Sequence, residues 1–398
     1  MAERDLRWAS MPGSQFARPR ARYAYLVADL RTGAVLDELP MHGVSFSTVL
    51  NDAGEFRGQL TIGDRRIGVH EPQRVSEPGR TALYVVRDGV LVWGGIIWTS
   101  KYNSRDRTLE VGAAGFLSYF DRRRVLPATY DPAHDDVATL VTTYVEVDQA
   151  EIARSLIRTA QSHPGGDIGV QDAATTSIGP ASEYPRTLTY HGYELKSVGE
   201  ALRELATLDN GPDFLIDVSF GPGGRPERRL QVGRPHLGQE GVPHFWEYGA
   251  NLVSYTWPQD GASMANRVYA LGSGSEAGQV IETAAGASWI SAGWPLTEAD
   301  VAHVHVNDRG LLSSIASAEL SSVARPVVLP ELVVRADRDP VLGSYQVGDR
   351  AQVVVKDGFF PGGKEFRVRL LGIEVTPGDD AGEELVTLTV SPALEEAA

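Results

Sequence analysis

The feature that most constrains the fold is a strand-turn-strand pattern that occurs twice. The first copy is VVRDGVLVWGGIIW, residues 85–98, and the looser second copy is VVVKDGFFPGGKEFRVRLLGIEV, residues 353–375. In each copy an apolar run meets a turn with a basic residue, Asp and Gly, and an apolar run with internal glycine follows. Asp-Gly favours tight hairpin turns because both residues tolerate positive φ. The pattern predicts two β-hairpins and indicates a larger duplication.

A second pair of segments widens this duplication. Both GVSFSTVLNDAGEFRGQLTI, residues 43–62, and NLVSYTWPQDGASMANRVYAL, residues 251–271, predict a strand, a turn and another strand. In the second copy, residues 272–326 separate this segment from the hairpin predicted at residues 353–375. The two pairs predict two weakly similar small antiparallel β-barrels, the second with an insertion. The Gly94-Gly95 pair predicts a bulge or sharp bend at a barrel corner.

The middle third changes to a helical period. Residues 148–165 place apolar side chains on one helical face, and Asp148 with Glu151 has the spacing of a capping box. Ser197 and Glu200 repeat that spacing before a second helix, and residues 213–235 predict a hairpin whose tip is residues 221–226. A third helix is predicted at about 308–324, where Arg325-Pro326 ends it.

The predicted fold class is therefore mainly β with an α+β middle domain: two duplicated small antiparallel β-barrels, a mixed α/β domain and an insertion. The predicted divisions are an N-terminal arm at 1–22, a first β-barrel domain at 23–125, a mixed α/β domain at 126–243, a second β-barrel domain at 244–275 and 326–398, and an insertion with a helix at 276–325.

Composition limits the class of protein. The 398 residues contain no cysteine, which excludes disulfides, thiolate zinc sites and cysteine nucleophiles. The sequence shows neither a signal peptide nor a run of about 20 apolar residues that would span a membrane, so synthesis in a cytoplasm is expected. The net charge of -15 argues against a general nucleic-acid-binding surface. A basic patch is conceivable in the N-terminal arm, although a disordered or partner-docking arm is favoured; its arginines are Arg4, Arg7, Arg18, Arg20 and Arg22.

Two groups of residues have the chemistry of metal ligands. His303 and His305 alternate in VAHVHVND, so both imidazoles can face one side of a strand, but no third ligand is evident. The segment PGDDAGEE clusters four carboxylates without the ligand spacing of an EF-hand loop: Asp379, Asp380, Glu383 and Glu384. A pair of polar strand residues and a solvated acidic hairpin tip are the preferred interpretations. No metal site and no cofactor site is therefore predicted.

Catalytic motifs are also missing from the sequence. GSGSEAG, residues 272–278, lacks the GK[ST] ending of a phosphate-binding loop, and neither GxSxG nor HExxH occurs. No catalytic residue is predicted. The tryptophans are expected to be core anchors, with stacking on a sugar as the alternative for Trp246, Trp257 and Trp294, and with core or inter-subunit packing for Trp93 and Trp98.

The order of these segments resembles the Gp37-like minor tail proteins of siphophages that infect actinobacteria. The resemblance is carried by HGVSFSTVLNDAGEF, VVRDGVLVWGGIIW, GAAGFLSYFDRRRV, VDQAEIARSLIRTAQSHPGGDIGV, VGEALRELATL, NLVSYTWPQDGASMANRVYALGSG, YQVGDRAQVVV and FRVRLLGIEVTPGDDAGEELVTLTV. It covers residues 23–391, and the order of the segments is more specific than any one of them.

The resemblance implies a structural virion component of the tail-tip or baseplate hub type, with no enzymatic activity. Two unequal barrels per chain imply a homotrimer, because three chains then present six similar faces to a sixfold tail tube. The implied partners are other tail proteins: the distal tail protein, the tape measure, and tip or fibre proteins. A tail-associated cell-wall hydrolase and a carbohydrate-binding adhesin are the alternatives.

The acidic charge has two interpretations in such a hub. An acidic wall would repel phosphates and let genome DNA pass without specific binding, or the charge merely keeps a large assembly soluble.

Overall fold

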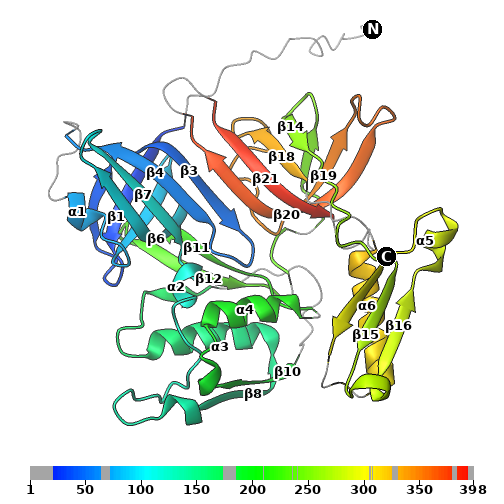
Figure 1. The fold of residues 1–398 in the computed structure, drawn as a ribbon. Coiled ribbons are helices and arrows are strands. Elements are labelled where there is room, and N and C mark those ends of the chain that lie inside the picture. The colour runs from blue at the N-terminus through cyan, green and yellow to red at the C-terminus, as the bar shows by residue number, and fades with distance from the viewer. Residues whose placement is uncertain are drawn as a thin grey trace, which may run out of the picture.

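The computed structural model describes residues 21–63, 72–173, 185–208, 210–234, 236–239, 241–303, 306, 308–324, 330–378 and 383–392. The described chain is mainly β, and its helices gather in a middle domain and in an insertion (Figure 1). This confirms the coarse form of the predicted fold class. The arginine-rich arm lies outside the described residues except for its end, where the Arg22 backbone N–H donates to Asp88 Oδ1 at 2.8 Å.

The first β region contains seven strands and two short helices. They are β1 (Tyr23–Asp29), β2 (Val35–Leu39), β3 (His42–Val49), β4 (Glu55–Thr61), α1 (Pro72–Val75), β5 (Thr81–Arg87), β6 (Val90–Asn103), β7 (Thr108–Gly115) and α2 (Leu117–Phe120). The second β region contains β13 (His244–Glu247), β14 (Leu252–Thr256), β18 (Glu331–Arg335), β19 (Arg350–Val355), β20 (Lys364–Thr376) and β21 (Leu385–Pro392). All these strands belong to one 13-stranded sheet.

Two series of six strands follow the same order in this sheet. In the first β region the order is β1-β5-β6-β7-β4-β3, and in the second it is β13-β19-β20-β21-β18-β14. The two differ at one end, because β1 pairs antiparallel with β5 whereas β13 pairs parallel with β19. The repeated order supports the duplication that the sequence predicts.

The structure does not confirm two separate closed barrels. Within the described residues no strand pairing closes either series, and β3 of the first series pairs with β20 of the second. The apolar interior is also shared, since one cluster of buried side chains includes Phe56 and Trp93 together with Trp246 and Val368. The two β regions are therefore two curved parts of one continuous sheet (Figure 1).

One predicted hairpin is wrong. Residues 251–271 do not fold back on themselves: β14 pairs with β18, whereas β15 (Arg267–Leu271) pairs with β16 (Ile281–Ala285) and β17 (Glu298–Ala302) in a separate sheet. The counterpart of the β3–β4 hairpin is thus β14 with β18, and the insertion lies between these two strands. The sequence comparison wrongly gave β15 as the partner of β14. Both β15 and β18 are short strands next to a turn, so the pattern does not distinguish them.

The two hairpins of the opening pattern are confirmed. β5 and β6 meet at Asp88 and Gly89, with φ of 50° and 84°, and β19 pairs antiparallel with β20. The glycine pair in β6 is not itself a bulge, since the register shifts lie on either side of it. A Cβ on Gly95 would lie 2.3 Å from the Ala114 carbonyl oxygen, so close backbone approach requires glycine there.

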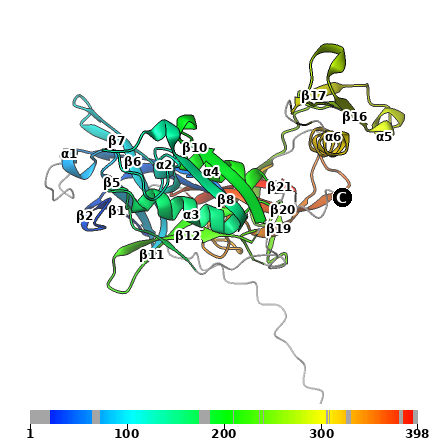
Figure 2. The same ribbon diagram turned by 90° about the horizontal axis from the view of Figure 1, so that it is seen from below.

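The middle domain packs against the first β region. It contains β8 (Val141–Asp148), α3 (Gln149–Ser162), β9 (Val170–Asp172), β10 (Pro185–His191), α4 (Val198–Thr207), β11 (Phe214–Phe220) and β12 (Pro226–Val232), with 3-10 turns at Val137–Thr139 and Gly192–Glu194. The predicted N-caps are confirmed: Asp148 accepts from the backbone of residues 150 and 151, and Ser197 Oγ accepts from the Glu200 N–H at 3.1 Å. The β11–β12 hairpin, also predicted, lies between the two α-helices and the first β region (Figures 1 and 2).

The insertion stands apart from the other domains as a small α/β unit (Figures 1 and 2). Its sheet has the order β16-β15-β17, and α6 (Arg309–Val323) covers it through a small core of Ala270, Leu312 and Ala316. A short helix, α5 (Ala287–Ser291), and a 3-10 turn at Glu276–Gly278 complete it. The helix predicted at 308–324 is therefore confirmed.

We predict that Gly95→Ala destabilises the fold by about 1–3 kcal/mol, because the new methyl group meets the Ala114 carbonyl oxygen, which belongs to the backbone. Chemical denaturation measures the change. Gly278→Ala is the matched control: nothing lies within 4 Å of its added Cβ, so a change below about 0.5 kcal/mol is expected. Equal effects of the two substitutions would contradict the close-approach explanation.

Candidate functional site

The junction between the two β regions is a strand pairing. Residues 46–49 of β3 run antiparallel to residues 372–375 of β20, and the Leu50 N–H donates to the Leu371 carbonyl at 2.8 Å. Trp93 of β6 supports β3 from the interior, where its Nε1 donates to the Ser47 carbonyl at 2.8 Å. The last strand of the first series is thereby fixed to a central strand of the second.

An ion pair closes the junction at a second point. Arg87, at the end of β5, donates from Nε and Nη2 to the two carboxylate oxygens of Glu384 at 2.7 and 2.8 Å. Tyr23 donates its hydroxyl proton to the same carboxylate. The Arg87 and Glu384 side chains are only 18% and 12% exposed, and a planar two-bond contact of this kind fixes orientation as well as distance. Burial and the hydrogen bond to Glu384 both raise the pKa of Tyr23, which keeps its proton available for donation.

A third contact ties the middle domain to both β regions. Asp213, just before β11, is paired with Arg369 of β20 and accepts from the Leu237 N–H at 2.8 Å. Asn51, in the turn after β3, accepts from the Phe214 N–H at 2.7 Å through its side chain. Polar residues from the turn after β3, from the segment just before β11 and from β20 therefore meet in one largely buried cluster.

The carboxyl groups of Asp213 and Asp217 have pKa values that are shifted in opposite directions. Burial opposes ionisation of Asp213, but His236 and the charge of Arg369 outweigh it and hold the pKa of Asp213 below its ordinary value. For Asp217, an exposed residue inside β11, partial withdrawal of the carboxylate from water raises the pKa, although the Val218 N–H donates to that carboxylate at 2.8 Å. The difference between them is that Asp213 has His236 and the largely buried Arg369 as partners.

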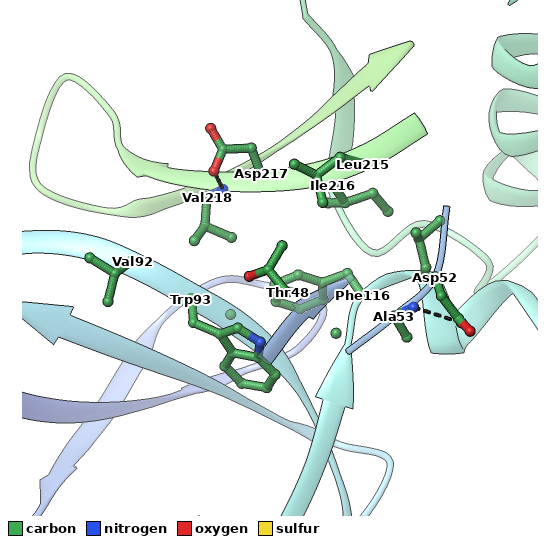
Figure 3. Close-up of a pocket in the computed structure, with 13 residues that line it drawn as sticks. Thr48, Asp52, Ala53, Val92, Trp93, Phe116, Leu215, Ile216, Asp217 and Val218 are labelled. Carbon is green, nitrogen blue, oxygen red and sulfur yellow. Dashed lines mark hydrogen bonds between the residues drawn. The ribbon is translucent and has the colours of Figure 1, made fainter. Parts of the chain in front are cut away.

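The pocket between β11 and the first β region is too small for a substrate. Figure 3 shows Trp93, Phe116, Ile216 and Val218 around it, with Asp217 at its rim. Its volume is about 40 Å³, room for a water molecule or so. It is a small packing cavity between β11 and the first β region.

A wider, open groove of about 570 Å³ runs along β3 and β4 and ends at Asp121. Three of its four carboxylates have cationic partners: Asp52 and Asp121 pair with Arg203, and Glu55 pairs with Arg57. No cluster of three or more metal-ligating side chains occurs in the described part of the chain.

The residues with metal-ligand chemistry have different surroundings. His303 directly follows β17, and its N–H donates to the Leu271 carbonyl at 2.7 Å, while His305 lies outside the described residues. Asp379 and Asp380 also lie outside them. Glu383 pairs with Arg335, and Glu384 pairs with Arg87, so the interpretation of a solvated acidic tip is wrong for Glu384. The sequence analysis did not identify Arg87 as a partner of Glu384. The available signal was the position of Arg87, a charged residue at the end of an otherwise apolar strand.

The tryptophans divide into core residues and exposed residues. Trp93 and Trp246 are 4% and 1% exposed, which confirms core anchoring for them. Trp257 is partly buried against Phe360 and Phe366, and Trp98 donates from Nε1 to Ser118 Oγ at 2.8 Å. Trp294 is 42% exposed in the insertion, where it contacts Trp289, so core anchoring is wrong there.

Comparison with solved structures identifies phage tail proteins of similar fold. The 43 kDa tail protein of prophage MuSo2 from Shewanella oneidensis superposes with a TM-score of 0.60 at 14% identity, over 94% of this chain and 99% of that chain. A tail protein from Neisseria meningitidis MC58 gives 0.57 at 14% identity, over 92% and 96%. No family model matches the sequence, and no curated protein matches it. The shared fold extends over nearly the whole length of each chain.

We predict that Glu384→Gln destabilises the protein by about 2–3 kcal/mol, because it leaves the largely buried Arg87 without its charged partner. Denaturant titration measures the loss. The adjacent Glu383→Gln is the control; Glu383 is 59% exposed beside Arg335, so its loss is expected to stay below about 1 kcal/mol. If both variants matched the wild type, the junction would not depend on this ion pair.

The opposite pKa shifts predict opposite effects of pH. The lowered pKa of Asp213 contributes stability that is complete above the ordinary value of 3.8 and is lost as pH falls through the folded-state pKa. The raised pKa of Asp217 costs stability as pH rises through 3.8 toward its folded-state pKa. Unfolding free energies measured from pH 3 to 7 should therefore rise less steeply for Asp213→Asn, and more steeply for Asp217→Asn, than for the wild type. Parallel curves for all three proteins would contradict these assignments.

Proposed function

We propose that the chain is a structural component of a phage tail, placed at the tail tip as a baseplate hub. The observation that carries the proposal is the pair of six-stranded series joined through β3, the last strand of the first series, and β20, a central strand of the second. The similar fold of two prophage tail proteins over almost their whole length supports it. The segment order that resembles Gp37-like minor tail proteins supports the siphophage assignment.

In this proposal three chains form a ring. Each chain supplies two similar series held at a fixed angle, so a threefold ring presents six similar units to a sixfold tail tube. The hub then joins the tube to the distal tip, next to the distal tail protein, the tape measure and tip or fibre proteins. Three chains with a charge of -15 each would surround the route of the genome, where the charge would repel DNA phosphates; the alternative is that it only keeps the assembly soluble.

The proposal assigns no enzymatic step to the chain. Three of the four carboxylates in the larger groove pair with arginines, and the pocket beside β11 is too small for a substrate. No described helix has the length and apolarity needed to cross a membrane. The protein therefore acts in the virion through its surfaces, after synthesis in the host cytoplasm.

We predict that the purified chain assembles into a particle of three 43.0 kDa subunits. Native mass spectrometry measures the stoichiometry, and electron microscopy of the particle, alone and within tails, should show a ring with three identical and six similar units. A strict hexamer in the tail would contradict the proposal. Cleavage of peptidoglycan by the chain would favour the hydrolase instead, and binding to purified surface glycans would favour the adhesin.

A further inference from the structure

The segment after α2 carries three consecutive arginines, Arg122, Arg123 and Arg124, which have no role in the proposed hub. α2 lies where the first β region meets the middle domain (Figure 1). The middle arginine is directed inward, since Arg123 Nη2 donates to the Ala160 carbonyl at 3.0 Å and contacts His163 Nδ1 at 3.2 Å. Arg122 and Arg124 are exposed. The run therefore consists of one structural arginine between two arginines at the surface.

The two exposed arginines line one open cavity of about 550 Å³. Its walls are formed by Trp98, Ser118, Asp121, Arg122 and Arg124. Neither arginine has an ion-pair partner in the described part of the chain, whereas Asp121 is paired with Arg203. Two guanidinium groups without a counter-charge, on the wall of a cavity in an acidic chain, form an arrangement that suits an anionic ligand.

Trp98 holds Arg122 in position. The Trp98 Nε1 donates to Ser118 Oγ at 2.8 Å, which fixes the ring, and the guanidinium carbon of Arg122 lies 4.3 Å from the centre of that ring. A guanidinium above an aromatic face keeps the N–H groups at its rim free for a carboxylate or a phosphate. Because the side chain is already ordered, less conformational freedom is lost when an anion binds.

The backbone of Arg124 presents an open edge. Arg124 forms an antiparallel bridge with Ser197, and the hydrogen bonds of this bridge are made by the residues on either side: the Val125 N–H donates at 3.0 Å and the Arg123 carbonyl accepts at 2.9 Å. In such a pair the N–H and C=O of the central residue point away from the bridge. Among the described residues nothing bonds to these two groups of Arg124, so they can pair with another extended segment.

We propose that this cavity binds an acidic peptide segment of a partner protein, in extended conformation and with carboxylates on alternate residues. The backbone of the segment would pair with the N–H and C=O of Arg124, and its carboxylates would bind the Arg122 and Arg124 side chains. Alternate side chains of a strand point to the same side and are about 6.6 Å apart, so they can meet two arginines that are two positions apart. The site lies within one chain and does not depend on the trimeric hub.

The surroundings favour a short peptide over a nucleic acid. Tight binding of a duplex requires neutralisation of several phosphates, and this cavity offers only two arginines without an ion pair. The groove along β3 and β4 adjoins the cavity at Asp121 and carries further carboxylates, among them Glu374. A long polyanion would be repelled by these carboxylates, whereas a short acidic segment can end before it reaches them.

Fluorescence anisotropy on the full chain tests the site, with a short fluorescein-labelled peptide in which glutamate alternates with threonine. Binding should be saturable and should weaken about tenfold in Arg122→Gln/Arg124→Gln, because two charge-assisted contacts are lost. Arg105→Gln/Arg107→Gln is the matched control, since these arginines are also exposed and two positions apart, and it should bind as the wild type does. Equal losses in the two variants would indicate a general effect of charge and overturn the site, as would an absence of saturable binding.

Altered ligands test how the segment binds. Replacement of its glutamates by glutamine should abolish binding, and N-methylation of its backbone amides should weaken it by removing donors for the Arg124 carbonyl. Unchanged binding of either peptide would overturn the corresponding part of the proposal. Displacement by single-stranded DNA or oligogalacturonate at a lower concentration than by unlabelled peptide would overturn the assignment to a peptide. Native mass spectrometry of Arg122→Gln/Arg124→Gln should show the same assembly as the wild type, so that failure of this site and failure of the hub are distinguishable.

Discussion

The pairing of β3 with β20 is the constraint on which the rest of the arrangement depends. Four residue pairs of backbone would be a weak link by themselves, but they do not act alone. The Arg87–Glu384 ion pair fixes the two regions at one end, and the Asp213–Arg369 pair fixes them to the middle domain at the other. Because these contacts lie at separate points, they restrict rotation between the regions as well as separation. The two similar series of strands are therefore held at a fixed angle to each other.

Local features of the fold could be predicted from the sequence because their causes are local. The Asp88-Gly89 turn needs residues that tolerate positive φ, and Asp148 and Ser197 cap helices with side chains that lie two or three residues from the groups they bind. The duplication was also visible, since a repeated strand order leaves a repeated pattern of turns. These inferences required no knowledge of how distant segments meet.

The junction could not be predicted because its partners are far apart in the chain. Arg87 and Glu384 are separated by 297 residues, and Asp213 and Arg369 by 156. In the sequence Glu384 is one of four clustered carboxylates, and an acidic cluster next to a turn ordinarily faces solvent. The error over β15 has the same origin, because strand pairing and not strand identity decides which sheet contains a segment. Closure of the barrels failed as a prediction for this reason: alternation of apolar residues specifies a buried face but not the partner at each edge.

The position of the insertion is also explained by strand pairing. It enters between β14 and β18, which still pair with each other, so the intervening chain leaves and returns at neighbouring points. The entropic cost of a longer excursion between such points grows only slowly with its length, which explains how a folded unit with its own core is tolerated there. Figure 1 shows this unit on the far side of the second β region from the β3–β20 junction. The junction between the two β regions therefore does not depend on the insertion, which carries the exposed Trp294.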